Sequence, residues 1–247
     1  MPELAIVMTY YQRQKQLNRT LESLRQYDSS KFVVVIVDDD SPDDIILPEL
    51  PYEVDILKLR NKTWHNSASV YNWGFHRAFE YNPKVIIIQN AECQHWGDIL
   101  SAAKEVTDGN YIAFPAYSLA ENEEASEGVI RNKAAEFNGE SAWYNHSVYR
   151  PHAFHFCSAI TVNNLKKING FDERLCDGIA YEDNVLVHHI RNLGLRIDIP
   201  ERPMVFHQWH YSGGTYDAEL VERNKNIWLE IEKDDSFRAV HALTPDL

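Results

Sequence analysis

Asn90 and Glu92 are the pair of residues whose types and spacing point most directly to chemistry. They follow Val85–Ile88, four β-branched apolar residues, at a point where polarity changes abruptly. A continuous apolar run this short is typical of a central parallel strand covered on both faces. Two residues apart in extended backbone, the two side chains point the same way. Glu92 offers a hard anionic oxygen suited to Mg²⁺ or Mn²⁺, and Asn90 offers an amide for a ribose hydroxyl or a metal-bound water.

Other candidate groups also come directly after apolar runs. Asp38-Asp39-Asp40 follows Phe32–Val37, and this acidic cluster suits either a metal site or a solvated turn. His207 follows Met204–Phe206, and a neutral imidazole there is a suitable Mn²⁺ ligand beside Glu92. Open α/β sheets bind ligands in the crevice at the carboxyl ends of their strands, so we expect these groups to lie near one another.

The elements that would position these groups alternate between short apolar runs and amphipathic stretches. Within 12–27, for example, leucines recur at helical spacing. The expected strands are Leu4–Met8, Phe32–Val37, Val54–Leu59, Val85–Ile88, Tyr111–Phe114, Phe154–Val162, Leu195–Ile199 and Met204–Phe206. The expected helices are Gln12–Tyr27, Ser67–Tyr81, Trp96–Val106, Asn163–Ile168, Glu182–Asn192 and Asp217–Lys233. This order predicts an α/β fold: a Rossmann-like, doubly wound, mostly parallel central sheet with helices on both faces.

Composition narrows the class of protein. With 247 residues, 44% of them hydrophobic, the chain can build one large α/β domain. The 24 Lys and Arg against 37 Asp and Glu give a net charge of −13. This negative charge argues against a nucleic-acid partner. It also means that an anionic substrate can bind only where a cation or local basic groups offset the repulsion. Three cysteines without metal-ligand spacing predict free thiols in a reducing compartment. Because no apolar run reaches the length of a membrane span and 1–9 is too short for a signal peptide, we expect a cytoplasmic protein.

Several segments, taken in order, resemble glycosyltransferases of family 2, which have the GT-A fold. Leu4–Leu24, ending in T-L-E-S-L, resembles the opening strand and helix of that family. Val37–Ser41 resembles its V-D-D-G-S segment, with Asp40 where glycine is usual. Asn66–Ala78 resembles the asparagine- and glycine-containing helix start that faces the sugar nucleotide.

Two further segments extend the resemblance to about residue 210. Gly170–Glu173, followed by Glu182-Asp183, resembles the G-F-D-E segment and the E-D pair of the family. Asn90 and Glu92 stand where its D-x-D signature belongs and replace both aspartates. Glutamate keeps a metal-binding carboxylate on a stem one methylene longer, whereas asparagine loses a charge and keeps its hydrogen bonding.

The resemblance implies a metal-dependent, inverting hexosyltransferase that moves a sugar from a nucleoside diphosphate sugar, a UDP-sugar by family expectation, to a hydroxyl of a glycan or other acceptor. It implies one domain, with about 1–114 binding the nucleotide, about 115–216 binding the acceptor, and 217–247 forming a C-terminal helix and tail. It assigns the general base to Asp183, beside Glu182, and a Mn²⁺ or Mg²⁺ ion to Glu92 and His207. The residues expected to bind the nucleotide are Thr9, Tyr11, Asp39, Arg60, Asn61, Asn72 and Asn90.

Two alternative functions compete with the glycosyltransferase interpretation. A sugar-1-phosphate nucleotidyltransferase would want a glycine-rich, basic loop after the first strand, and Thr9–Lys15 contains no glycine. A nucleotide-sugar or carbohydrate-binding protein that has lost turnover stays open because Asn90 replaces a carboxylate. The transferase reading requires five widely separated side chains to converge on one cleft, namely Asp39, Asn90, Glu92, Asp183 and His207.

Overall fold

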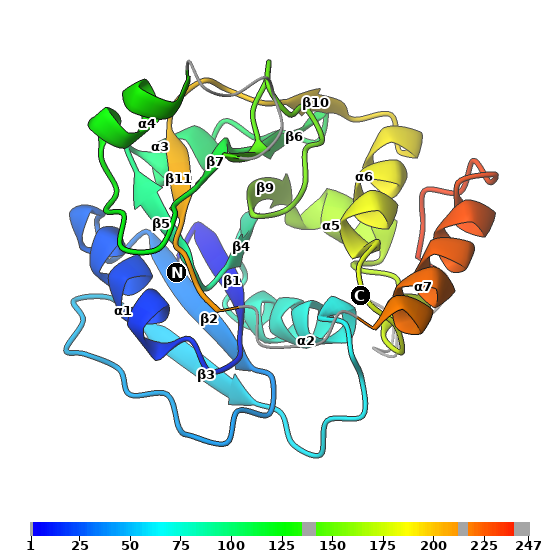
Figure 1. Ribbon diagram of the computed structural model, residues 1–247, viewed down its shortest axis with the longest axis horizontal. Coiled ribbons are helices and arrows are strands. Elements are labelled where there is room, and N and C mark those ends of the chain that lie inside the picture. Colours follow the sequence, from blue (N-terminus) through cyan, green and yellow to red (C-terminus); the bar gives the residue numbers. More distant parts are fainter. Residues whose placement is uncertain (1, 135–141, 212–216, 240–247) are drawn as a thin grey trace.

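The computed structural model describes residues 2–134, 142–211 and 217–239, and a seven-stranded sheet forms its centre (Figure 1). The strand order is β10-β6-β9-β4-β1-β2-β3. Its strands are β1 (Leu4–Tyr10), β2 (Phe32–Asp38), β3 (Val54–Lys58), β4 (Val85–Asn90), β6 (Asn110–Ala113), β9 (Cys157–Thr161) and β10 (Arg196–Asp198). β1 pairs in parallel with β2 and β4, β2 with β3, and β6 with β10, whereas β9 runs antiparallel to β4 and β6. The expectation of a mostly parallel sheet is confirmed.

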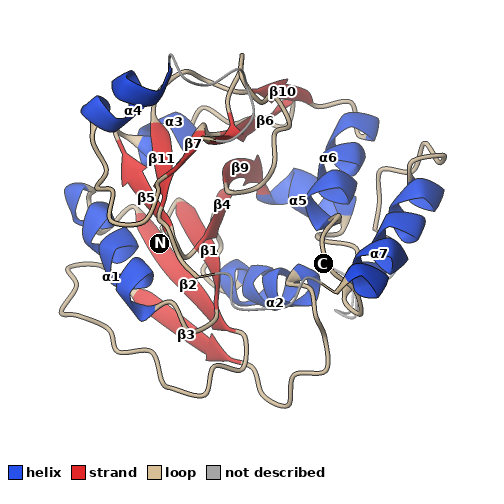
Figure 2. Ribbon diagram, in the orientation of Figure 1, coloured by secondary structure: helices blue, strands red, loops and turns tan. Residues whose placement is uncertain are grey.

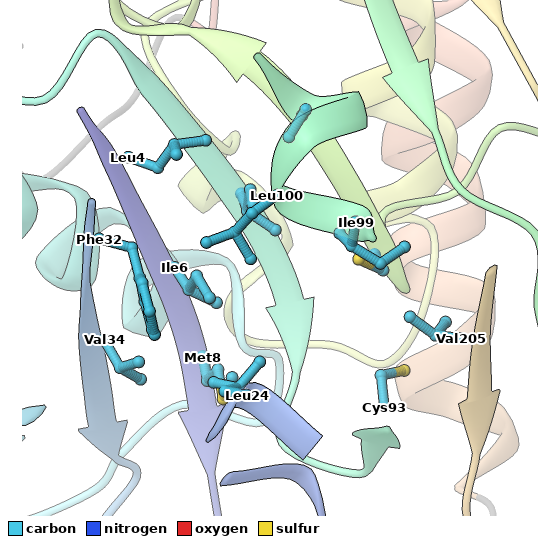
Figure 3. Packing of buried hydrophobic residues seen from close by; sticks show 14 of the residues in the cluster. Leu4, Ile6, Met8, Leu24, Phe32, Val34, Cys93, Ile99, Leu100 and Val205 are labelled. Carbon is cyan, nitrogen blue, oxygen red and sulfur yellow. The ribbon is translucent and has the colours of Figure 1, made fainter. Parts of the chain in front are cut away.

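Helices cover both faces of this sheet. One face packs against α1 (Gln14–Ser23), the 3₁₀ turn η1 (Leu24–Gln26) and α3 (Ile99–Ala103), and the other against α2 (Ala68–Phe79), α5 (Val162–Ile168) and α6 (Glu182–Asn192). Along β1, Leu4, Ile6 and Met8 pack with the first group, as Figure 3 shows, while Ala5 and Val7 pack with the second. Because each face of β1 is covered, every residue from 4 to 8 is apolar and fully buried.

A second, four-stranded sheet was not anticipated from the sequence (Figure 2). Its order is β5-β11-β7-β8, from β5 (Cys93–Trp96), β11 (Met204–His207), β7 (Ala116–Ser118) and β8 (Trp143–Asn145). The polar stretch Glu121–Tyr149, read as a long excursion, holds α4 (Glu127–Ala134) and β8, and its residues 135–141 lie outside the described part. β11 coincides with the expected strand Met204–Phe206, whereas β5, β7 and β8 were not expected, because strands this short show little periodicity.

The remaining elements are η2 (Glu173–Leu175), which begins just after the G-F-D segment, and the C-terminal helix α7 (Ala218–Ile231). The three cysteines are buried and unpaired, as expected. None of the described helices combines the length and the apolar character needed to cross a bilayer.

Helix α2 lies directly against the sheet at Gly74, and this contact gives a test of stability. A Cβ atom at Gly74 would lie 2.5 Å from Cγ1 of Val7 and 2.9 Å from Cγ2 of Val37, both on fully buried strands. We expect Gly74→Ala to lower the free energy of unfolding by about 1–3 kcal/mol, since overpacking outweighs the better helix propensity of alanine. Denaturant unfolding measures this change.

Gly128 in α4 provides the matched control. A Cβ there would meet nothing nearer than Oγ of Ser126 at 3.8 Å. Gly128→Ala should therefore leave stability unchanged or raise it by up to about 1 kcal/mol. A Gly74→Ala protein as stable as the parent would contradict the close packing of α2 on β1 and β2.

Candidate active site

The strand topology gathers several chain segments at one edge of the large sheet. Because β1, β2 and β4 are parallel, their carboxyl ends meet there, and Thr9 lies opposite Val37 on one side and Asn90 on the other. β9 runs the opposite way, so it begins at the same edge, and the backbone N–H of Asn90 donates to the carbonyl of Phe156 at 3.1 Å. A cleft of about 380 Å³ opens at this edge.

Most of the predicted site residues line this cleft, from elements that are far apart in the sequence. They come from β1 and the loop after it, from the loop after β2, from the end of β4 and from the start of α6. The predicted residues that line the cleft are Thr9, Tyr11, Asp39, Asn90, Glu92, Glu182 and Asp183. Four of the five side chains required to converge therefore do so, and the fifth, His207, reaches the site by contacting Glu92.

Glu92 lies where the two sheets join, between the end of β4 and the start of β5. β11 pairs antiparallel with β5, with His207 opposite Cys93, and the backbone N–H of Gln208 donates to the Glu92 carbonyl at 3.0 Å. This register places Nε2 of His207 3.3 Å and Nε2 of His210 3.5 Å from Oε1 of Glu92. Ligand atoms of the three residues lie within 4.8 Å of one another. One carboxylate oxygen and two imidazole nitrogens fit Mn²⁺ as a ligand set.

The Glu92 carboxylate is almost completely buried, with 3% of its side chain exposed. Burial alone would favour the neutral acid. Hydrogen bonds from His207 and His210, together with the charge of Arg13, outweigh burial and hold the pKa of Glu92 well below its usual range. NH1 of Arg13 donates to Oε1 of Glu92 at 2.5 Å. Glu92 is thus kept ionised, as a metal ligand must be.

Asp183 lies in the first turn of α6, where the helix dipole favours negative charge. Its Oδ1 accepts a hydrogen bond from the backbone N–H of His155 at 2.9 Å and lies 2.5 Å from Nδ1 of the same histidine. Its Oδ2 has no hydrogen-bond partner among the described residues, although Asp183 lines the cleft. The neighbouring Glu182 accepts from Nδ2 of Asn66 at 2.7 Å, and burial, then the charge of Asp183, raises the pKa of Glu182.

Asp39 lines the cleft from the loop after β2. Its Oδ2 accepts from Nζ of Lys62 at 2.5 Å and its Oδ1 from Nε1 of Trp64 at 2.7 Å. Burial raises the pKa of Asp39 against the opposing effects of Lys62 and Trp64. The ring of Tyr11 is 46% exposed, with Nζ of Lys62 5.2 Å from its centroid. Asn90 lies nearby and its Oδ1 accepts from the Tyr71 hydroxyl at 3.0 Å.

Three residues predicted to bind the nucleotide lie outside the cleft lining. Asn72 is fully buried: its Nδ2 donates to the Phe171 carbonyl at 2.9 Å and to Oε1 of Glu173 at 2.8 Å, so it fastens α2 to the G-F-D-E segment. Arg60 and Asn61 are exposed and follow β3, the outermost strand of the sheet, whose end is one strand further from the cleft than that of β2. These positions do not support the expected nucleotide contacts.

The structure adds residues to the cleft that were not selected from the sequence, namely Arg13, Asn66, Tyr71 and His155. For Asn66 a signal exists, because Asn just before a helix is a frequent cap, and its Oδ1 accepts from the backbone N–H of Ala68 at 3.0 Å. Tyr71 and His155 sit among apolar residues and carry no such signal. His210 also joins His207 at Glu92.

Comparison with known proteins supports this architecture. Residues 5–124 match the model of the family described as Glycosyl transferase family 2. The match covers Asp39, Asn90 and Glu92 but ends before Asp183 and His207. A search of curated proteins found no match.

Solved structures share the fold at low sequence identity. S. aureus TarS 1–349 is 13% identical, with a TM-score of 0.59 over 84% of this chain and 60% of that one. The same protein in complex with UDP-GlcNAc is 12% identical, with a TM-score of 0.58 over 87% of this chain and 60% of that one. The mannosyltransferase PcManGT from Pyrobaculum calidifontis, in complex with GDP-Man and Mn²⁺, is 14% identical. Its TM-score is 0.57 over 92% of this chain and 62% of that one. The chain thus spans about three fifths of the length of these proteins, and the expected GT-A fold and resemblance to family 2 are confirmed.

The pair of His155 and Asp183 leads to a titration test. Burial alone would lower the pKa of His155, but the charge of Asp183 and its hydrogen bond outweigh burial, so the pKa of His155 is raised above its usual value of about 6.5. A raised histidine pKa stabilises the fold below about pH 6.5, and this contribution is lost as the pH rises through the folded-state pKa. In Asp183→Asn burial should dominate and the pKa of His155 should fall below about 6.5.

NMR titration of the imidazole signals measures both pKa values. His152 is a control within the same protein, since it lies three residues away, and neither Asp183 nor Glu182 contributes to its lowered pKa, which reflects burial first. Its titration should be the same in both proteins. A His155 signal that titrates identically with and without the Asp183 carboxylate would refute the pairing.

Proposed function

We propose that this chain, a GT-A protein whose residues 5–124 match glycosyl transferase family 2, is a metal-dependent, inverting glycosyltransferase. It moves a sugar from a nucleoside diphosphate sugar, in particular a UDP-sugar, to a hydroxyl acceptor. The observation that carries the proposal is a single cleft that holds Glu92, with two histidines behind it, and the Asp183 carboxylate. The complexes of TarS with UDP and UDP-GlcNAc, and of PcManGT with GDP-Man and Mn²⁺, support the donor class and the metal.

The nucleoside would bind at the Asp39 end of the cleft. Asp39 accepts two hydrogen bonds here, from Lys62 and Trp64, and a carboxylate that accepts N–H groups can equally accept one from a base or a ribose hydroxyl. The exposed ring of Tyr11 offers a face for stacking. Asn90 would meet the ribose, because its Nδ2 is without a partner among the described residues while its Oδ1 is fixed by Tyr71.

Glu92, His207 and His210 would hold the divalent cation. The chemistry that such an ion supplies when bound is neutralisation of the charge that develops on the diphosphate leaving group. The three residues are pre-arranged for this task because β5 and β11 pair directly beneath them. His207 is buried and its ring packs against the stacked rings of Tyr144 and Phe156, with centroid distances of 4.7 Å and 5.7 Å, which fixes its orientation toward Glu92.

Asp183 would act as the general base. Its Oδ2 accepts the proton of the acceptor hydroxyl while the hydroxyl oxygen bonds to the anomeric carbon and the bond from that carbon to the diphosphate oxygen breaks. The backbone and ring of His155 hold Oδ1, so that Oδ2 keeps one position in the cleft. Because one base serves a single in-line displacement, the configuration at the anomeric carbon inverts.

Asp183→Asn tests this assignment, since the amide keeps the shape of the side chain but cannot accept the proton. We expect transfer to fall by about 100-fold or more, with the affinity for UDP unchanged. The measurement is release of UDP from a panel of UDP-sugars offered with glycan acceptors, with and without Mn²⁺. Release should require Mn²⁺ in the parent protein.

Asp177→Asn is the matched control, because Asp177 precedes α6 by only a few residues yet is 72% exposed and pairs with Arg223 outside the cleft. It should transfer sugar at the parent rate. Full activity of Asp183→Asn would remove Asp183 as the base. Binding of UDP without turnover of any donor and acceptor pair would favour the alternative of a nucleotide-sugar-binding protein.

A further inference from the structure

Arg13 is a positively charged residue in a cleft whose charged lining residues are mainly carboxylates. Four carboxylates line the cleft, from Asp39, Glu92, Glu182 and Asp183, whereas Arg13 is the one lining residue in the described part of the chain that is always cationic. A nucleoside diphosphate adds further negative charge. The cleft therefore depends on few positive groups, and what each of them pairs with decides which ligands can bind.

The guanidinium of Arg13 occupies the oxygen that a metal ion would need. Arg13 immediately precedes α1, and its NH1 lies 2.5 Å from Oε1 of Glu92. This is the same oxygen that His207 and His210 face at 3.3 Å and 3.5 Å. Two cations at one carboxylate oxygen repel each other strongly in a buried site. Arg13 and a divalent cation thus compete for Oε1 of Glu92.

The two partners of this ion pair differ in freedom. The Glu92 side chain is 3% exposed and is held by two histidines, whereas that of Arg13 is 35% exposed and lies in the cleft wall. Among the described residues, the guanidinium makes one side-chain contact, from NH1 to Glu92. Its remaining donors are available, and a planar guanidinium matches the oxygens of a phosphate in a bidentate manner. Arg13 is therefore the partner that can leave.

We propose, on the basis of the function proposed above, that Arg13 is an exchangeable counter-ion of Glu92. With no metal bound, its guanidinium neutralises the buried carboxylate. When Mn²⁺ binds at Glu92, the guanidinium leaves and pairs with the diphosphate of the nucleotide. Binding of metal and of nucleotide is thereby coupled, because the metal releases the cation that the nucleotide uses.

This coupling predicts two effects of opposite sign for Arg13→Gln. Mn²⁺ alone should bind more tightly, by about tenfold or more, because its competitor is gone and an unpaired buried carboxylate gains most from a cation. UDP should bind more weakly in saturating Mn²⁺, by about tenfold, because a charge-assisted contact is lost. If the ion pair with Glu92 were purely structural, Arg13→Gln would weaken the binding of both Mn²⁺ and UDP. If Arg13 only contacted phosphate, Arg13→Gln would leave Mn²⁺ binding unchanged.

Isothermal titration calorimetry measures these affinities for the parent chain, Arg13→Gln and Arg13→Lys. Arg19→Gln is the matched control, since Arg19 lies on the exposed face of α1, outside the cleft lining, and loses the same charge. It should leave both affinities unchanged. Arg13→Lys keeps a charge but lacks the guanidinium fork, so both shifts should have the same signs and smaller sizes, which preserves the test if Arg13→Gln fails to fold.

The outcomes separate this inference from the function on which it rests. Unchanged or weakened Mn²⁺ binding by a folded Arg13 variant overturns the exchange, while the proposed function stands if the parent chain binds Mn²⁺ together with UDP. A parent chain that binds neither Mn²⁺ nor UDP overturns the proposed function, and the exchange fails with it.

Discussion

The structure depends on one buried carboxylate at the junction of two sheets. Glu92 leaves water almost entirely, and an ionised carboxylate in such a place costs several kcal/mol unless cations or hydrogen-bond donors surround it. The small sheet provides such donors, because pairing of β11 with β5 places His207 and, three residues later, His210 beside the Glu92 carboxylate. Arg13 adds a third cationic or hydrogen-bond-donating group at the same carboxylate oxygen. The carboxylate and the two imidazoles together present oxygen and nitrogen atoms of the kinds that divalent cations bind, as the proposed function requires.

The surroundings of Asp183 in the cleft depend on a different constraint, namely the direction in which one strand, β9, runs. β9 is the strand that runs against its neighbours, so its start lies at the edge where the parallel strands end. That reversal places His155 beside Asp183 and Phe156 beside Asn90. Segments far apart in the sequence are thus joined through backbone pairing, and the Asp183 carboxylate is positioned by the sheet together with the first turn of α6.

Much of the fold could be predicted from the sequence because its dominant signals are local. Continuous apolar runs mark the strands of a sheet covered on both faces, and the helix Glu182–Asn192 has the predicted bounds. The cleft followed from the rule that parallel strands end together, which places Asn90 beside Thr9. Apolar patterning was less informative for the second sheet, whose strands are too short to show a period.

The parts of the site that were not predicted depend on long-range pairing. Nothing near Arg13 in the sequence shows that it meets Glu92, which is 79 residues away, and the same holds for His155 and Asp183. Asn72 shows the converse case: an amide suits a nucleotide or a buried backbone equally well, and tertiary packing places Asn72 against the backbone of Phe171. Residue type restricts chemistry, whereas topology decides which groups meet.

We propose that Glu92 and its two histidines form a cation site within a nucleotide-binding cleft. Diffraction from crystals grown with UDP and Mn²⁺, recorded at the manganese absorption edge, tests it most directly. We expect an anomalous peak within bonding distance of the Glu92 carboxylate and of His207, with His210 as a further ligand, and UDP in the same cleft. Bound UDP with no manganese at Glu92, or manganese only at some other place, would contradict it.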